Sequence, residues 1–194
     1  MNRTSNSTIL ALFLVTIGGF SHMANSIEEP RYELVQALGE IEIRQYEPVI
    51  QAVTQLPESS ASSEGFRRLA GFIFGGNERE QQISMTAPVQ ETLGTSKPMM
   101  AFTMPAQYSF DQLPTPADER VALMEVPAKT VAVVTFSGWA TEAKVARYES
   151  VLREVLRQNA IEATGSSSLN QYNPPWTLPF LRRNEIMIEI ERPS

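Results

Sequence analysis

The sequence predicts an α+β domain in which two strand-helix-strand-strand units form one curved, mostly antiparallel sheet, a distorted barrel with two packed helices. Three observations support this prediction. Several short segments alternate apolar and polar residues, which is typical of half-buried strands. Two longer segments carry apolar residues every three or four positions, which is typical of amphipathic helices. The order strand, helix, strand, strand then occurs twice along the chain.

The first half of the chain contains four expected strands. Residues 40–46 and 49–54 alternate between apolar and polar side chains, which favours two consecutive strands. Two further strands are expected over residues 83–91 and 99–104, because both segments are rich in apolar residues and a turn signal at Gly94 separates them.

A helix is expected between Ser62, which can cap a helix at its amino terminus, and Gly75-Gly76, which end it. Its core-facing stripe is predicted to be Phe66, Leu69, Ala70 and Ile73. Phe72 lies four residues after Arg68, so a ring and a guanidinium share a second face. Such a face suits a cleft in which the ring packs on a flat ligand and the guanidinium binds a carboxylate. In the alternative interpretation, Arg67 and Arg68 are solvated and Phe72 covers the edge of the core.

The second half is expected to follow the same order. Residues 130–137 predict a strand, residues 141–160 a helix, and residues 167–172 and 184–190 two strands. The core stripe of this longer helix is predicted to be Val145, Tyr148, Leu152, Val155 and Leu156. Residues 111–118 contain two prolines and are interpreted as the connection between the halves, a loop within one domain.

Charge and length limit the possible functions. The chain has 194 residues, which is enough for one full core, and a formal net charge of −6. Residues 1–26 contain one basic residue and no acidic residue, so removing that positive charge leaves −7 from Ile27 onward. Nucleic-acid binding needs a basic face, so we do not expect a nucleic-acid partner.

The amino terminus has the pattern of a signal peptide. Arg3 precedes an apolar run from Ile9 to Phe20, and Ala24-Asn25-Ser26 has the small-x-small form of a cleavage site. We therefore expect residues 1–26 to be a signal peptide and residues 27–194 to be an exported domain, in the periplasm or cell envelope and without stable membrane insertion after cleavage. The alternative is an uncleaved amino-terminal anchor.

Histidine and cysteine are almost absent from the sequence. There is no cysteine, and the one histidine, His22, lies in the expected signal peptide. This composition excludes disulfides, thiolate ligation of haem and zinc-thiolate sites, and it leaves the exported domain without a serine-histidine triad. We therefore expect no metal site, and only methionine or tyrosine is available as an axial ligand to iron. The candidates are Met85, Met99, Met100, Met104, Met124, Met187, Tyr32, Tyr46, Tyr108, Tyr148 and Tyr172.

Four segments, in this order, resemble the SOUL/haem-binding protein family, whose architecture is that of the gyrase-inhibitor-like superfamily. They are EPRYELVQALGEIEIRQYEP (29–48), SSEGFRRLAGFIFGGN (62–77), NEREQQISMTAPV (77–89) and YNPPWTLPFLRRNEIMIEI (172–190). The resemblance implies non-covalent binding of haem or a related tetrapyrrole in a hydrophobic cleft, for buffering, transport or scavenging. The expected partner is thus a small-molecule tetrapyrrole, held without a histidine axial ligand.

The resemblance indicates one residue that binds this cofactor, and the helix spacing and a second basic pair indicate the others. In the family a helix at the place of residues 62–75 borders the haem cleft, and an arginine near its start meets the propionates; Arg67 matches that position best. We therefore expect cofactor-binding residues on this helix, together with a second basic pair before the last strand. The set is Arg67, Arg68, Phe72, Arg182 and Arg183.

Two alternatives remain at the level of sequence. Some superfamily relatives resemble hydrolases of small strained molecules that use a cleft glutamate, and Glu185 or Glu189 on the last expected strand could point into a cleft. The other alternative is a general binder of flat hydrophobic ligands. No phosphate-binding loop or catalytic triad accompanies these residues, so we expect no catalytic residues and a binding protein rather than an enzyme.

Overall fold

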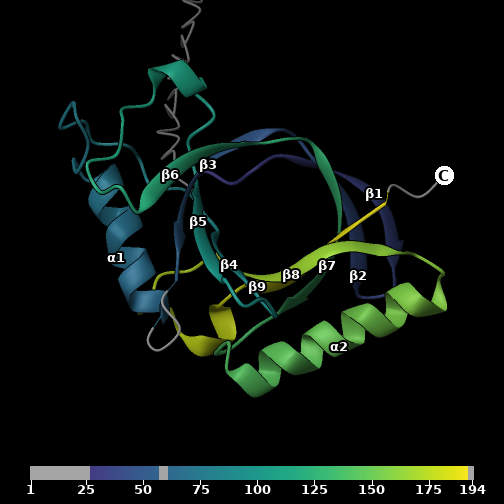
Figure 1. The fold of residues 1–194 in the computed structure, drawn as a ribbon. Helices are drawn as coiled ribbons and strands as arrows, with labels where there is room; N and C mark the ends of the chain where they lie inside the picture. Colours follow the sequence, from purple (N-terminus) through teal and green to yellow (C-terminus); the bar gives the residue numbers. More distant parts are fainter. Residues whose placement is uncertain (1–26, 57–60, 192–194) are drawn as a thin grey trace, which may run out of the picture.

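A computed structural model describes residues 27–56 and 61–191, and the expected signal peptide lies outside these residues. Within them, nine strands form one sheet and two α-helices pack against it (Figure 1). The strands are β1 (Tyr32–Leu38), β2 (Ile41–Tyr46), β3 (Val49–Gln55), β4 (Val89–Thr92), β5 (Met99–Thr103), β6 (Val121–Val126), β7 (Lys129–Phe136), β8 (Ala163–Gln171) and β9 (Asn184–Ile190). The helices are α1 (Ala61–Ile73) and α2 (Glu142–Gln158), with short 3-10 turns η1 (Phe110–Gln112) and η2 (Pro179–Leu181).

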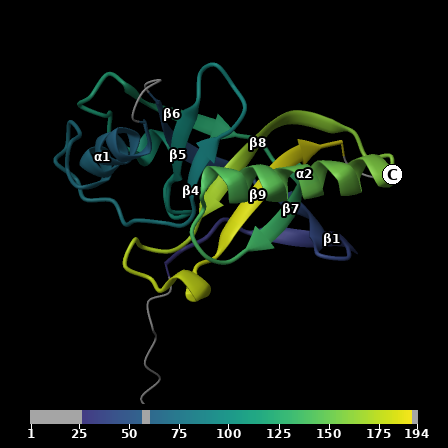
Figure 2. The ribbon, with the colours of Figure 1, turned by 90° about the horizontal axis from the view of Figure 1, so that it is seen from below.

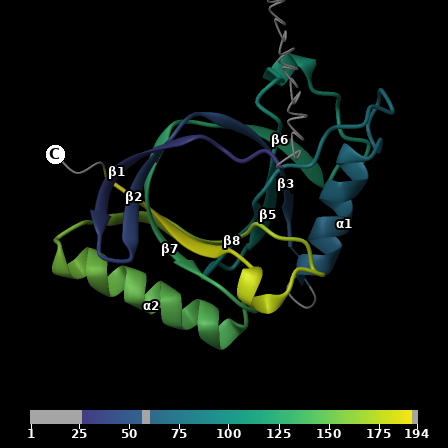
Figure 3. The same ribbon diagram turned by 180° about the vertical axis from the view of Figure 1, so that it is seen from behind.

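The sheet is antiparallel throughout and strongly curved. Its strand order is β1-β2-β7-β9-β8-β4-β5-β3-β6, with β1 and β6 as the two edges. Figures 1 and 3 show both helices outside the curve, on the convex face. The helix α2 packs on β7, β8 and β9, which it crosses in Figure 2, and α1 packs on β3, β5 and β6. The predicted fold class, a curved antiparallel sheet with two packed helices, is confirmed.

Each helix covers its own apolar core. Alternate residues of β2, β7 and β9 point toward α2, and burial of this face accounts for one core: Ile41, Ile43, Ala132, Val134, Phe136, Val145, Leu152, Leu156, Leu169, Ile186, Ile188 and Ile190. The second core lies under α1 and comprises Ala52, Leu56, Leu69, Phe72, Ile73, Ile83, Met100, Phe102, Met104, Leu113 and Val121. Among the described residues, both cores and all the strand pairs follow Ile27 in the chain.

The two edge strands were not predicted from the sequence. In β1, six of seven residues are exposed and the seventh is partly buried, so neither face imposes an apolar alternation. In β6 only Val121 is fully buried. The expected strand over 83–91 was also too long, because β4 contains only residues 89–92. The other predicted strands and both helices are confirmed within a few residues of their expected ends.

Two phenylalanines of α1 exchange the positions predicted for them. Phe72 is 2% exposed and lies in the core, whereas Phe66 is 38% exposed and contacts Phe102 edge-on at 5.3 Å between ring centroids. At 100° per residue, the two rings lie about 60° to either side of Leu69, so helical periodicity alone does not show which of them is buried in the core. The position of the sheet decides between them: the Phe72 ring lies in the core, as in the alternative interpretation, and forms no open face with Arg68.

No helix among residues 27–56 and 61–191 is both long and apolar enough to span a membrane.

Candidate functional site

The concave face of the sheet carries a buried polar cluster. Side chains alternate along a strand, so residues next to the isoleucines of β2 and β9 point away from α2 and into the curve. Arg44 on β2 and Glu185 on β9 occupy such positions, and they are 5% and 2% exposed. A charged residue buried to this extent needs a partner of opposite charge.

That partner is supplied across the sheet. Arg44 Nη1 lies 3.1 Å from Glu185 Oε2, and Arg44 Nε donates to Glu42 Oε2 at 2.7 Å. The Tyr172 hydroxyl donates to Glu185 Oε2 at 2.6 Å, and Arg44 Nη1 donates to the Tyr46 hydroxyl at 3.2 Å. These contacts occupy both charged groups, so the cluster is an internally satisfied network.

The network fixes protonation states. Burial lowers the pKa of Arg44, but the Glu185 carboxylate and the Tyr46 hydroxyl outweigh burial, and the net pKa is raised above its ordinary value. Burial and the nearby Glu185 charge raise the pKa of Tyr172 well above its ordinary value of 10.0. Arg44 is therefore charged and Tyr172 is protonated at neutral pH.

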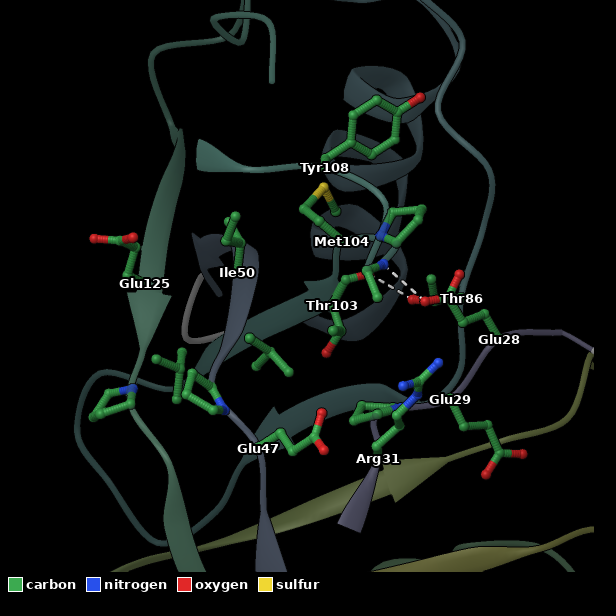
Figure 4. A pocket seen from close by; sticks show the side chains of 17 residues that line it. Glu28, Glu29, Arg31, Glu47, Ile50, Thr86, Thr103, Met104, Tyr108 and Glu125 are labelled. Carbon is green, nitrogen blue, oxygen red and sulfur yellow. Dashed lines mark hydrogen bonds between the residues drawn. The ribbon is translucent and has the colours of Figure 1, made fainter. Parts of the chain in front are cut away.

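A cavity of about 760 Å³ opens at one end of the concave face (Figure 4). The acidic residues Glu28, Glu29, Glu47 and Glu125 and one cation, Arg31, line this mouth, and Figure 4 shows Arg31 between Glu29 and Glu47. With four carboxylates and one guanidinium, the lining of the mouth has a net negative charge, which disfavours an anionic ligand.

The mouth continues into a narrow interior. Six lining residues are common to both parts, among them Val49, Thr103 and Val126. Beyond them Tyr46 and Tyr172 line a space of only about 40 Å³. This space is far smaller than the mouth, so a macrocycle would enter the interior only if the side chains that line it moved.

A second hollow lies along the outer face of α1. This α1 groove, of about 1100 Å³, is lined by Glu64, Arg67, Arg68, Gly71, Phe72 and Gly76, and by Ala117, Asp118, Glu119 and Arg120 from the loop before β6. Three of the five predicted site residues, Arg67, Arg68 and Phe72, therefore line one hollow, although the Phe72 side chain itself is buried in the core.

The arginines of the α1 groove differ in how they are paired. Arg68 forms an ion pair with Glu64 and donates to the Gln55 carbonyl at 3.0 Å. Arg120 pairs with Asp118 at 2.7 Å, and its hydrogen bonds lower the pKa of Asp118 to about 2. Within the described part of the chain, Arg67 is exposed and forms no ion pair. Arg67 is thus the guanidinium best placed to receive an external carboxylate.

The family assignment is decided by comparison with known proteins. The family model described as SOUL heme-binding protein matches residues 27–189. The chain belongs to this family. Heme-binding protein 1 of Xenopus tropicalis is 30% identical over 156 residues, which cover 75% of this chain and 80% of that protein. Heme-binding protein 2 of Homo sapiens is 28% identical over 187 residues, which cover 84% of this chain and 89% of that protein.

Solved structures share the SOUL fold at low sequence identity. The EcmrR C-terminal domain superposes with a TM-score of 0.62 at 11% identity, covering 81% of this chain and 100% of that chain. A hydrolase from Listeria innocua superposes with a TM-score of 0.58 at 9% identity, covering 81% of this chain and 94% of that chain. At this identity the similarity establishes the fold and not the activity.

The other two predicted site residues of this SOUL domain lie outside the α1 groove. Arg182 donates to the Thr177 carbonyl at 2.9 Å and to the Pro175 carbonyl, and its guanidinium carbon lies 3.7 Å from the Trp139 ring centroid. Arg183 pairs with Glu29 and lies 3.5 Å over the Tyr172 ring. Both arginines thus hold the segment between β8 and β9, and the structure does not bring them together with Arg67.

Sequence reasoning identified Glu185 as a cleft candidate but missed its partners. Glu189, the other candidate, is exposed. Arg44 lies 141 residues before Glu185, so only the order of β2, β7 and β9 reveals the pair. The available signal was a charged residue on the same face as Tyr46 in an otherwise buried strand. Among the described residues, no group of three or more histidine, cysteine, aspartate or glutamate side chains is arranged to hold a metal ion.

Proposed function

We propose that this protein binds haem or a related tetrapyrrole without a covalent bond, in the α1 groove. The observation that carries the proposal is the match to the SOUL heme-binding protein family together with an open groove that displays Arg67. The relatives reported above are named heme-binding proteins, and their similarity covers most of this chain.

Charge favours the α1 groove over the acidic mouth. A tetrapyrrole such as haem carries propionate carboxylates, which need cations close by. The groove is lined by three arginines and three acidic residues, and Glu64 and Asp118 are already paired with arginines. The mouth is lined by four carboxylates and one arginine, and although Glu29 also pairs with Arg183, the remaining negative charge would repel the propionates.

The surface of α1 also suits a flat ligand. Arg67, Gly71 and Phe74 are spaced at i, i+4 and i+7, and all three are exposed. A β-carbon placed on Gly71 would meet no atom within 4 Å, so the helix is open and flat at this point. A macrocycle lying there would place one edge near Arg67 and the other near Phe74.

The expected affinity is moderate. Burying on the order of 400 Å² of apolar porphyrin surface at about 25 cal/mol/Å² gains roughly 10 kcal/mol, of which at least about 4 kcal/mol offsets the cost of association. One or two charge-assisted hydrogen bonds to Arg67 at about 1.5–3 kcal/mol each then correspond to micromolar binding or tighter.

Axial ligation is not part of this site. The residues that line the α1 groove include no histidine, cysteine, methionine or tyrosine. Iron therefore adds little to binding, and metal-free protoporphyrin should bind almost as well as haem. We assign the protein a role in buffering, transport or scavenging of the tetrapyrrole, in the periplasm or cell envelope, on the basis of the signal-peptide pattern of residues 1–26.

One observation favours a second candidate function, a hydrolase of small strained molecules. Glu185 and the Tyr172 hydroxyl lie 2.6 Å apart below the acidic mouth, an arrangement that can hold or transfer a proton. Both groups are engaged with each other and with Arg44, so activity would require a ligand to displace one of these contacts. A Glu185→Gln variant would then lose turnover while its tetrapyrrole binding stayed intact.

The test is a titration of residues 27–194 with hemin and with protoporphyrin IX, followed by the Soret band and by tryptophan quenching. We expect one-to-one saturation by both ligands and at least tenfold weaker binding in Arg67→Ala. The matched control is Arg31→Ala, which removes an exposed arginine from the acidic mouth and should change affinity less than twofold. A larger loss in Arg31→Ala would place the ligand in the mouth. If neither ligand saturates, the proposal is wrong, and other flat hydrophobic ligands become the candidates.

A further inference from the structure

An exposed apolar surface lies at the segment between β8 and β9. Trp176 and Phe180 are 83% and 71% exposed, and three more large apolar side chains near them are exposed as well. The full set, here called the apolar tip, is Trp139, Trp176, Leu178, Phe180 and Leu181. Trp139 belongs to the segment before α2 and joins the others because Arg182 stacks on it and Gly138 N donates to Pro179 O at 2.8 Å.

Hydrogen bonds support the apolar tip from beneath. Arg182 is buried beneath the tip and binds the carbonyls of Pro175 and Thr177. The backbone amides of Thr177 and Leu181 donate to carbonyls three residues earlier, at 3.0 and 2.9 Å. These hydrogen bonds fix the backbone from which the exposed apolar side chains project.

The apolar tip presents no charge. Residues 173–181 contain no acidic or basic side chain, and the following Arg182 is turned inward. Protein interfaces usually carry about one hydrogen bond per 100–200 Å² of buried area, and the side chains of the apolar tip offer few donors or acceptors for such bonds. Tryptophan, phenylalanine and leucine without charge are instead the composition that enters the interfacial region of a bilayer.

The apolar tip lies close to the start of the described chain. Arg183, directly after the tip, forms an ion pair with Glu29, three residues into the described chain. Figure 2 shows the segment before β9 and the start of the described chain along the same lower edge of the molecule. The described chain therefore begins close to the base of the apolar tip, where Glu29 pairs with Arg183.

We propose that the apolar tip is a membrane-docking surface that inserts into the interfacial region of a lipid bilayer. The proposal is independent of tetrapyrrole binding in the α1 groove, which involves none of these five side chains. The net charge of −7 from Ile27 onward and the carboxylates of the mouth near Glu29 favour zwitterionic over anionic lipid.

The experiment measures binding to phosphatidylcholine vesicles by flotation and by tryptophan emission, for the full chain and for residues 27–194. Trp139 and Trp176 are the two tryptophans of the chain, so emission reports this surface directly. We expect a lipid-dependent blue shift, and at least tenfold weaker partition of Trp176→Ala/Phe180→Ala in both chains. The matched control is Phe110→Ala, which removes an exposed ring on η1 and should change partition less than twofold.

Several outcomes would overturn the proposal. A role for the apolar tip would be excluded if the protein did not bind the vesicles, or if Phe110→Ala weakened vesicle binding as much as Trp176→Ala/Phe180→Ala. A blue shift that follows protein concentration instead of lipid concentration would mean that the surface binds a second copy of the chain. Hemin titration of the same variants separates the two proposals, because we expect Trp176→Ala/Phe180→Ala to bind hemin with unchanged affinity.

Discussion

The hydroxyl of Tyr172 donates a 2.6 Å hydrogen bond to the carboxylate of Glu185, and the two residues lie at the two ends of the segment that carries the apolar tip. The Tyr172 amide also donates to the Arg183 carbonyl at 3.2 Å. Glu185 is at the same time the partner of Arg44 on the concave face. One buried carboxylate therefore links the base of the exposed segment to the centre of the sheet.

This relationship predicts sensitivity to alkaline pH. Burial and the Glu185 charge raise the pKa of Tyr172 above 10.0, so the folded chain keeps a proton that the unfolded chain loses. The resulting stability is fully present below about pH 10 and is lost as pH rises further, by up to about 1.4 kcal/mol per pH unit. In urea unfolding between pH 8 and 11, the free energy of unfolding should fall less steeply with pH in Tyr172→Phe than in the unmodified protein. If the free energy of unfolding fell equally steeply with pH in both proteins, Tyr172 would ionise normally in the folded state.

The Arg44–Glu185 pair predicts an asymmetric mutational response. Arg44→Met leaves Glu185 buried without its cation, so we expect the free energy of unfolding to fall by about 3–5 kcal/mol. Arg44→Met/Glu185→Leu removes both charges and should recover at least half of that loss. The control is Arg153→Met, which breaks a surface pair with Glu149 and should cost less than about 1 kcal/mol in the same urea titration. Similar losses for Arg44→Met and Arg153→Met would contradict the buried pair.

Elements with one buried face could be predicted from the sequence. The residues of α2 that were expected in the core are buried or partly buried, and β9 has the predicted bounds because its isoleucines alternate against a single core. The edge strands β1 and β6 could not be found, since exposure on both faces leaves no periodic signal.

The candidate site was less accessible to sequence reasoning. Family resemblance indicated Arg67 and helix spacing indicated Arg68, and both line one groove. Arg182 and Arg183 have partners that only the folded chain reveals. The Arg44–Glu185 pair depends on strand order and register across β7, and no local pattern encodes that register.

Gly71 predicts a trade-off between stability and binding. A β-carbon at this helical position would meet no other atom, so Gly71→Ala should raise the free energy of unfolding by about 0.5–1 kcal/mol. Gly71→Leu places a bulky side chain on the surface proposed for the tetrapyrrole, and we expect hemin affinity to fall at least tenfold. Thermal unfolding and hemin titration of both variants provide the measurements. Unchanged hemin binding in Gly71→Leu would exclude this face of α1.

The contacts of Arg182 are expected to stabilise the segment that carries the apolar tip. Its planar guanidinium binds two carbonyls and stacks on Trp139, and the ammonium of Arg182→Lys cannot reproduce this geometry. We expect the free energy of unfolding to fall by about 1–3 kcal/mol. Chymotrypsin should also cleave faster near Trp176 and Phe180, because local opening exposes their backbone.

The control for this prediction is Arg153→Lys, which changes an exposed arginine of α2 in the same way. Its cleavage rate should match that of the unmodified protein under identical conditions. Cleavage of Arg182→Lys at the same rate would show that the prolines of residues 173–181 hold the segment without Arg182. Faster cleavage together with weaker vesicle partition would instead mean that membrane docking depends on the support that Arg182 provides beneath the apolar tip.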